Sequence, residues 1–251
     1  MQNGDPDLSG IWRRTVAAHE SIEAHPKTLD DQETPSSVVD PIDGYTPLQP
    51  WAEAQRRYNR TAYVHHNAIC RLDGVPLSMY MTGLYQFNQT PRNILIQGEE
   101  AHAFRMIPFS VSHKLSEEIK LWNGDSIGSW DNNTFVVDTT NQNARAWLDQ
   151  RGRFFTDEAH VEERFTLVDD NTLHYQATIT DDNVFFSQQE LMNLLMNVEA
   201  FDGEFPEKSI QTFLDFVDLT IDEFWECVDR FRQDHIRKKE NGKWKIRSQV
   251  S

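Results

Sequence analysis

The sequence contains few cysteines and no long hydrophobic run, and each shortage excludes a class of protein. The two cysteines, Cys70 and Cys227, fall in different parts of the 251-residue chain, so a disulfide framework is not expected. No apolar stretch approaches the length that crosses a bilayer, and the polar N-terminus MQNGDPDLSG is unlike a signal peptide. The chain as written is therefore expected to be cytoplasmic, without membrane insertion, or periplasmic if a signal peptide has been removed.

Basic residues are also scarce. The chain has 24 Lys and Arg residues against 40 Asp and Glu residues, which gives a formal net charge of −16. Such a surface repels nucleic acid, so no nucleic-acid partner is expected. The GxSxG, Walker, GxGxxG and HExxH motifs are missing from the sequence, and its histidines lack the spacing of a metal site. We therefore expect no cofactor and no metal.

The residues that are present favour a packed β domain. Hydrophobic residues make up 38% of the chain and aromatic residues 11%, which is enough for a core in one large domain or two smaller ones. The clearest patterning lies in residues 124–180. Three runs there, at 134–140, 160–168 and 172–180, are rich in β-branched and aromatic residues and are separated by Gly, Asn and Asp. They predict an antiparallel meander.

Shorter strands and one early helix complete the predicted fold. A helix is expected to begin at Thr46-Pro47, and the period of the apolar residues changes from two to 3.6 near Phe186. We predict a mainly β fold: an antiparallel, lipocalin-like β-barrel over residues 1–185, followed by a small C-terminal helical module over residues 186–251. The further strands are predicted at residues 11–16, 77–81, 85–89, 93–97 and 102–107.

Two charged residues interrupt strand faces that are otherwise apolar. Glu163 and Arg105 each have apolar residues two positions away, so both side chains are predicted to point into the barrel. A buried carboxylate needs a partner or a shifted pKa. One hypothesis makes this pair catalytic, with Glu163 as acid or base, Arg105 stabilising negative charge and Tyr175 assisting. The other makes it a structural pair that fixes the strand register.

Other side chains are candidates for contact with a substrate. These candidates lie on an aromatic strand face, on a later strand that carries a carboxylate, in the long connection 141–157 that carries a tryptophan, and at a histidine near Cys70. For each residue, the alternative is an ordinary role in the core, in a loop or at the surface. The predicted substrate-binding residues are Tyr85, Phe87, Gln89, Asp138, Trp147 and His66.

Several blocks in the same order carry a first resemblance. They include PDLSGIW at residues 6–12, CRLDGVP at 70–76, GDSIGSWDNNTFVVDTT at 124–140 and HVEERFTLVDDNTLHYQATI at 160–179. Over residues 6–185 the chain resembles a large group of bacterial proteins of unassigned function, abundant in soil bacteria and sphingomonads. The resemblance implies a mostly β, barrel-like domain and no particular activity.

A second resemblance covers residues 188–250. Its blocks are FDGEFPEK at 201–208, TIDEFWECVDRFR at 220–232 and NGKWKIRSQV at 241–250. This segment is similar to the C-terminal part of N-acetyl sugar amidotransferases, ATP-using enzymes of surface-polysaccharide synthesis. The Ser-Gly-Gly-x-Asp-Ser loop that binds ATP in that family is missing from the chain, so the resemblance does not imply their activity.

These observations lead to a functional expectation with open alternatives. The first is an enzyme without a redox cofactor that acts on an apolar or aromatic small molecule by proton transfer, as a lyase, dehydratase, isomerase or cyclase. The second is a binding protein for a hydrophobic small molecule, without turnover. The third is an interaction module whose C-terminal segment docks on a partner. A homodimer is compatible with all three.

Overall fold

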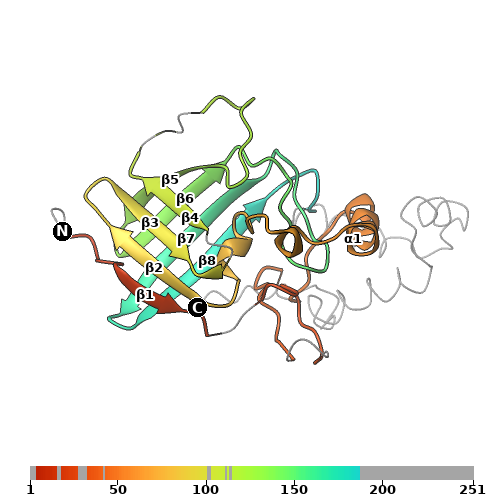
Figure 1. Cartoon of the computed structure of the whole chain (residues 1–251), viewed down its shortest axis with the longest axis horizontal. Helices are drawn as coiled ribbons and strands as arrows, with labels where there is room; N and C mark the ends of the chain where they lie inside the picture. Colours follow the sequence, from red (N-terminus) through yellow and green to blue (C-terminus); the bar gives the residue numbers. More distant parts are fainter. Residues whose placement is uncertain are drawn as a thin grey trace, which may run out of the picture.

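The fold is given by a computed structural model, which describes residues 4–15, 18–27, 33–41, 43–100, 103–110, 112 and 115–186. Within these residues, eight strands form two four-stranded antiparallel sheets (Figure 1). The first sheet contains β1 (Gly10–Arg13), β2 (Leu84–Gln89), β3 (Asn93–Gly98) and β4 (Phe104–Pro108). The second contains β5 (Asp125–Asp131), β6 (Thr134–Thr140), β7 (His160–Asp169) and β8 (Thr172–Thr180). The predicted mainly β character is confirmed.

The two sheets pack face to face through the apolar side of each strand. Side chains alternate across a strand, so every second residue of β2 and β3 is buried, including Phe87 and Ile96. Phe135 and Phe165 are the fully buried aromatic residues of the opposite sheet. The ring centroids of Phe87 and Phe165 lie 5.7 Å apart, which joins both sheets in one core.

A glycine lets the sheets approach at one edge. A Cβ atom on Gly128 of β5 would lie 2.5 Å from the ring of Phe135, so only glycine fits beneath this ring. Phe109, which follows β4, forms a parallel bridge with Gly128. The first sheet therefore meets the second at the β4–β5 edge.

The opposite edge is open, and the prediction of a closed barrel is wrong for the described residues. Closure requires every strand to pair on both sides, but β1 pairs with β2 alone and β8 with β7 alone. We call the gap between β1 and the β7–β8 turn at Asp170-Asn171 the open seam.

A second, smaller core lies beneath the loops beside the sheets. Arg153 holds it together by bonding Asp149 at 2.7 Å and pairing with Glu23. Asp149 is fully buried and also accepts a hydrogen bond from the amide of Ile22. These bonds tie the segment that follows β1 to the connection between β6 and β7. The buried apolar residues of this core are Ile22, Ala146, Leu148, Phe155 and Ala159.

The helix begins later than predicted. Helix α1 spans Pro50–Ala62, with Pro50 in its first turn. Thr46 does not cap it, because the Thr46 hydroxyl and amide both donate to Oε1 of Glu23, at 2.6 and 2.8 Å. The strand predicted at residues 77–81 is also wrong, since Leu77–Met79 forms a 3₁₀ turn.

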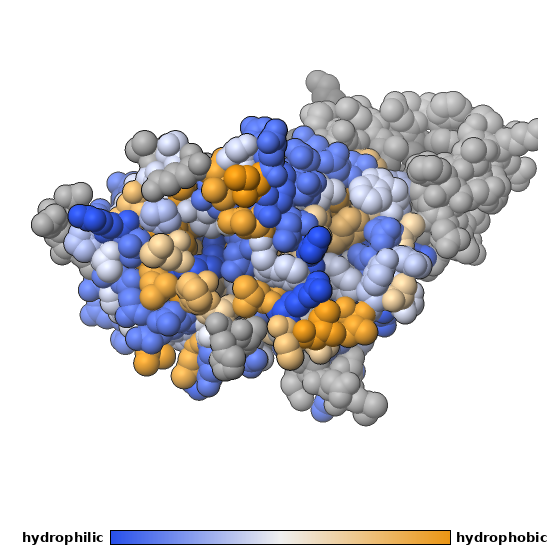
Figure 2. Space-filling model, turned by 45° about the horizontal axis from the view of Figure 1, so that its top comes forward, coloured by the Kyte–Doolittle hydropathy of each residue, from blue (hydrophilic) through white to orange (hydrophobic). Residues whose placement is uncertain are grey.

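The described residues end at Phe186, so the predicted helical module at 186–251 lies almost wholly outside them. None of the described helices is long and apolar enough to cross a membrane. On the face shown in Figure 2, apolar residues form small separate groups among polar ones. Groups of this size do not by themselves identify a protein interface.

Candidate functional site

The two charges predicted to point inward meet between the sheets. Arg105 of β4 donates to both carboxylate oxygens of Glu163 on β7, from Nη1 at 2.9 Å and from Nη2 at 2.6 Å. The Arg105 side chain is 6% exposed and that of Glu163 is 0% exposed. This is a bidentate, fully enclosed ion pair that links one sheet to the other.

Hydroxyl groups complete the surroundings of this pair. The Tyr175 hydroxyl donates to Oε1 of Glu163 at 3.0 Å. Nη2 of Arg105 also donates to Oγ of Ser126 at 3.3 Å, and Ser126 shares a hydrogen bond with Thr139. Each oxygen of Glu163 therefore has at least one donor, so the carboxylate needs no external partner.

Burial and the ion pair act on the pKa of Arg105 in opposite directions. Burial alone would lower it, but the charge of Glu163 and the hydrogen bonds to it raise the pKa above its ordinary value. The pKa of Tyr175 is raised well above its ordinary value, first by burial and then by the negative charge of Glu163. Arg105 thus stays charged and Tyr175 stays protonated near neutral pH.

Little free space adjoins the pair. A cavity of about 10 Å³ lies beside Arg105, lined also by Tyr85 and Met79. That is close to the smallest volume that holds a single water molecule. Contact between this cavity and a substrate would require the surrounding side chains to move.

Two more tyrosines extend the polar interior toward the open seam. Tyr80 packs edge-on against Tyr175, with ring centroids 6.1 Å apart, and its pKa is raised by burial and by the charge of Glu163. The Tyr85 hydroxyl donates to the carbonyl oxygen of Met81 at 2.8 Å, and burial raises the pKa of Tyr85 to about 12. We call Tyr80, Tyr85 and Tyr175 the interior tyrosines.

Arg14 lies at the end of this group, just after β1. Its guanidinium carbon is 5.5 Å from the centroid of the Tyr80 ring, within the range of a cation–π contact. Its Nη1 atom is buried and has no hydrogen-bond partner among the described residues. Burial lowers the pKa of Arg14, an effect that the interior tyrosines oppose.

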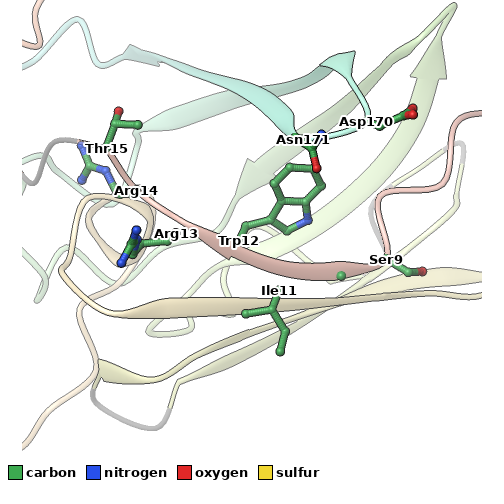
Figure 3. Close-up of a pocket in the computed structure, with 9 residues that line it drawn as sticks. Ser9, Ile11, Trp12, Arg13, Arg14, Thr15, Asp170 and Asn171 are labelled. Atoms are coloured by element: carbon green, nitrogen blue, oxygen red, sulfur yellow. The ribbon is translucent and has the colours of Figure 1, made fainter.

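A groove of about 680 Å³ occupies the open seam (Figure 3). The Trp12 indole points from β1 toward Asn171 in the opposing turn. Arg14 lies at one end of the groove and Asp170 toward the other. The Trp12 Nε1 atom donates to the carbonyl oxygen of Leu8 at 3.0 Å, which holds the ring in place. The groove is lined by Ser9, Gly10, Ile11, Trp12, Arg13, Arg14, Thr15, Asp170 and Asn171.

The structure brings some of the predicted substrate-binding residues near the ion pair. Tyr85 is 4% exposed and lines the small cavity beside Arg105. Phe87 is 1% exposed and packs against Phe165, whose ring centroid lies 4.9 Å from that of Tyr175. Both are core residues between the sheets, and neither lines the groove.

The other predicted substrate-binding residues lie apart from the ion pair. Gln89 clamps the segment before β1, accepting from the Leu8 amide at 2.9 Å and donating to the Pro6 carbonyl at 3.0 Å. Asp138 is 45% exposed and contacts His160 at 3.0 Å on the outer side of the second sheet. Trp147 packs against His65 in the loops. The side chain of His66 lies outside the described part of the chain.

No group of three or more His, Cys, Asp and Glu side chains in the described part of the chain could hold a metal ion. The histidine on β7 contacts a carboxylate on the outer side of the sheet, and the histidine on β8 is exposed.

Sequence reasoning missed Trp12 and Arg14, the two residues that distinguish the groove. The pattern that identified Arg105, a charged residue among apolar neighbours on one strand face, also occurs around Arg14. In a strand, Arg14 shares a face with Trp12, so it is a charge on an otherwise apolar inward face. The same test applied to the first strand would have identified it.

Comparison with known proteins gives one partial match. A family model described as "LPS biosynthesis protein WbpG-like, C-terminal domain" matches residues 168–250, about a third of the chain. No curated protein and no solved structure matches. The matched part begins near the end of β7 and includes β8, so the described part of the chain contains only its first residues. It is consistent with the predicted resemblance to sugar-biosynthesis proteins.

Proposed function

We propose that the β domain binds a small organic molecule with an apolar or aromatic body in the groove of the open seam. The observation that carries this proposal is the groove itself, which lies where the two sheets fail to meet. Its volume of about 680 Å³ falls within the range of about 300–1,000 Å³ that small-molecule sites occupy. The Trp12 ring provides an apolar wall with a fixed orientation.

The interior ion pair supports binding more readily than turnover. Glu163 is 0% exposed and its oxygens already accept bonds from Arg105 and Tyr175. A general base must reach the proton that it removes, directly or through one water molecule. A pair enclosed in this way is well suited to hold the two sheets at the separation that forms the groove.

A proton-transfer enzyme remains the second candidate, and one contact path favours it. The Tyr175 hydroxyl bonds Glu163, the Tyr175 ring packs on Tyr80, and Arg14 lies over Tyr80 at the groove. In this reading Glu163 is the acid or base, Arg105 stabilises developing negative charge and Tyr175 assists. The reaction would be of the lyase or isomerase type.

Fluorescence of a hydrophobic probe tests binding. N-phenyl-1-naphthylamine, an uncharged aromatic amine, should bind with enhanced emission. Trp12→Ala should weaken binding about tenfold, because burial of a large side chain contributes about 1.5–3 kcal/mol. Met106→Ala is the control, since Met106 lies on β4, is 64% exposed and does not line the groove.

A second variant changes Asn171, which lines the groove on the side opposite β1. Asn171→Phe should obstruct the groove without altering β1. Unchanged probe affinity in both Trp12→Ala and Asn171→Phe, with both proteins folded by circular dichroism, would refute binding in the groove.

Hydrogen exchange separates the two candidate functions. A bound molecule identified by native mass spectrometry would be incubated with the protein in D₂O. Proton transfer at carbon would incorporate deuterium with the wild type and not with Glu163→Gln or Tyr175→Phe. A ligand recovered without deuterium after prolonged incubation would support binding alone.

A further inference from the structure

Arg14 is a partly buried cation that makes no ion pair with any residue the structure describes. Arg105 and Arg153, the arginines of the ion pairs described above, each have a carboxylate within 3 Å. Arg14 instead has the face of Tyr80, and its Nη1 atom is covered but makes no hydrogen bond within the described residues. A buried nitrogen of this kind is costly unless something accepts its hydrogen bonds.

Neighbouring groups do not supply that acceptor. Asp170 lines the same groove, but no ion pair joins it to Arg14. In Figure 3, Arg14 lies toward one end of the groove and Asp170 toward the other, with Trp12 between them. The groove therefore has a positive end, an aromatic middle and a negative end.

We propose that the ligand of the groove is an organic acid whose acidic group pairs with Arg14 while its apolar or aromatic body lies against Trp12. This inference rests on the proposed function and specifies its ligand class. A guanidinium matches a carboxylate or a similar oxyanion with parallel hydrogen bonds. The acid lies at the Arg14 end, since Asp170 repels it from the other end.

The overall charge of the chain makes this preference testable. At a net charge of −16 the protein repels anions in general. A preference for an anion over its neutral analogue must then come from a local cation. Arg92 carries the same charge, is exposed and does not line the groove, so it provides a matched control.

Two probes with the same ring system measure the preference. 8-Anilinonaphthalene-1-sulfonate carries an acidic group that N-phenyl-1-naphthylamine lacks. The wild type should bind the sulfonate at least about tenfold more tightly, because hydrogen bonds to charged groups contribute about 1.5–3 kcal/mol. Arg14→Gln should remove this difference, while Arg92→Gln, which lies outside the groove, should keep it.

Each outcome has a defined meaning. Equal affinity of the wild type for the two probes, or a preference that survives in Arg14→Gln, overturns the inference while the proposed function stands. Probe binding that is insensitive to both Trp12→Ala and Asn171→Phe refutes the proposed function itself. Arg14 makes no ion pair or hydrogen bond in the described residues, so Arg14→Gln should fold, and added salt provides an independent check. Raising the salt concentration should weaken binding of the sulfonate and not of the neutral probe.

Discussion

Removing one member of the Arg105–Glu163 pair leaves the other as an uncompensated charge between the sheets. Glu163→Gln keeps the shape of the side chain but leaves the Arg105 cation, 6% exposed, without a counter-ion. Losses of this kind cost about 3–5 kcal/mol. A domain with about 5–15 kcal/mol of total stability would lose about a fifth or more of it. The midpoint of thermal unfolding should fall by about 6–20 °C.

A double-mutant cycle tests whether this cost comes from the pair. Urea unfolding, followed by tryptophan fluorescence, gives the free energy of unfolding for Glu163→Gln, Arg105→Met and the double variant. The double variant leaves no unpaired charge, so it should cost at least about 2 kcal/mol less than the sum of the single variants. Asp131→Asn provides the surface control, because the Asp131–Arg164 pair is exposed and should contribute at most about 1 kcal/mol. A cost for Glu163→Gln no larger than that of Asp131→Asn, or additive single costs, would refute the reasoning.

Three further predictions concern the core and the groove. The interior tyrosines should make stability fall above about pH 10, because folding raises their pKa values and the folded protein keeps protons that the unfolded chain releases. The slope should be about 1.4 kcal/mol per pH unit for each tyrosine, and a flat profile of urea unfolding between pH 8 and 11 would contradict it. Gly128→Ala should cost about 1–3 kcal/mol by chemical denaturation, because its new methyl group meets the Phe135 ring, whereas Gly98→Ala, with no neighbour closer than 3.6 Å, should cost less. Arg14→Met should leave the melting temperature unchanged or raise it, since it removes a partly buried cation that makes no hydrogen bond or ion pair within the described residues. A drop of more than about 5 °C by differential scanning calorimetry would indicate a structural role.

Local patterns predicted most of the strands, because alternation is a property of adjacent residues. The runs predicted at 134–140, 160–168 and 172–180 correspond to β6, β7 and β8. Strand β5 was missed, since Ser, Gly and Asp dominate its sequence and give no strand signal. Its place is set by pairing with β6 and by the close packing of Gly128 under Phe135, which are tertiary effects.

A charged residue on an otherwise apolar strand face correctly indicated a side chain in the interior, but it did not indicate what that side chain does. The sequence pattern led to Arg105 and Glu163, and the structure brings the two side chains within 2.6 Å. Asp138 could not be placed from pattern alone, because its outward direction depends on the register of β6 with β7. The groove was not predictable either. It results from the lack of pairing between β1 and β8, which depends on how the two sheets come together.

The order of the strands has a consequence for how the chain folds. In each sheet, spatial neighbours are also successive strands, and every ladder except β1–β2 joins strands that follow one another closely in the chain. Strands β2–β4 and β5–β8 can therefore gain much of their backbone pairing before the two sheets dock. The salt link between the sheets, which connects positions 58 residues apart, would then form late. Loss of the Arg105–Glu163 pair should therefore increase the unfolding rate far more than it decreases the refolding rate. The pair would then contribute mainly to the kinetic stability of the folded domain.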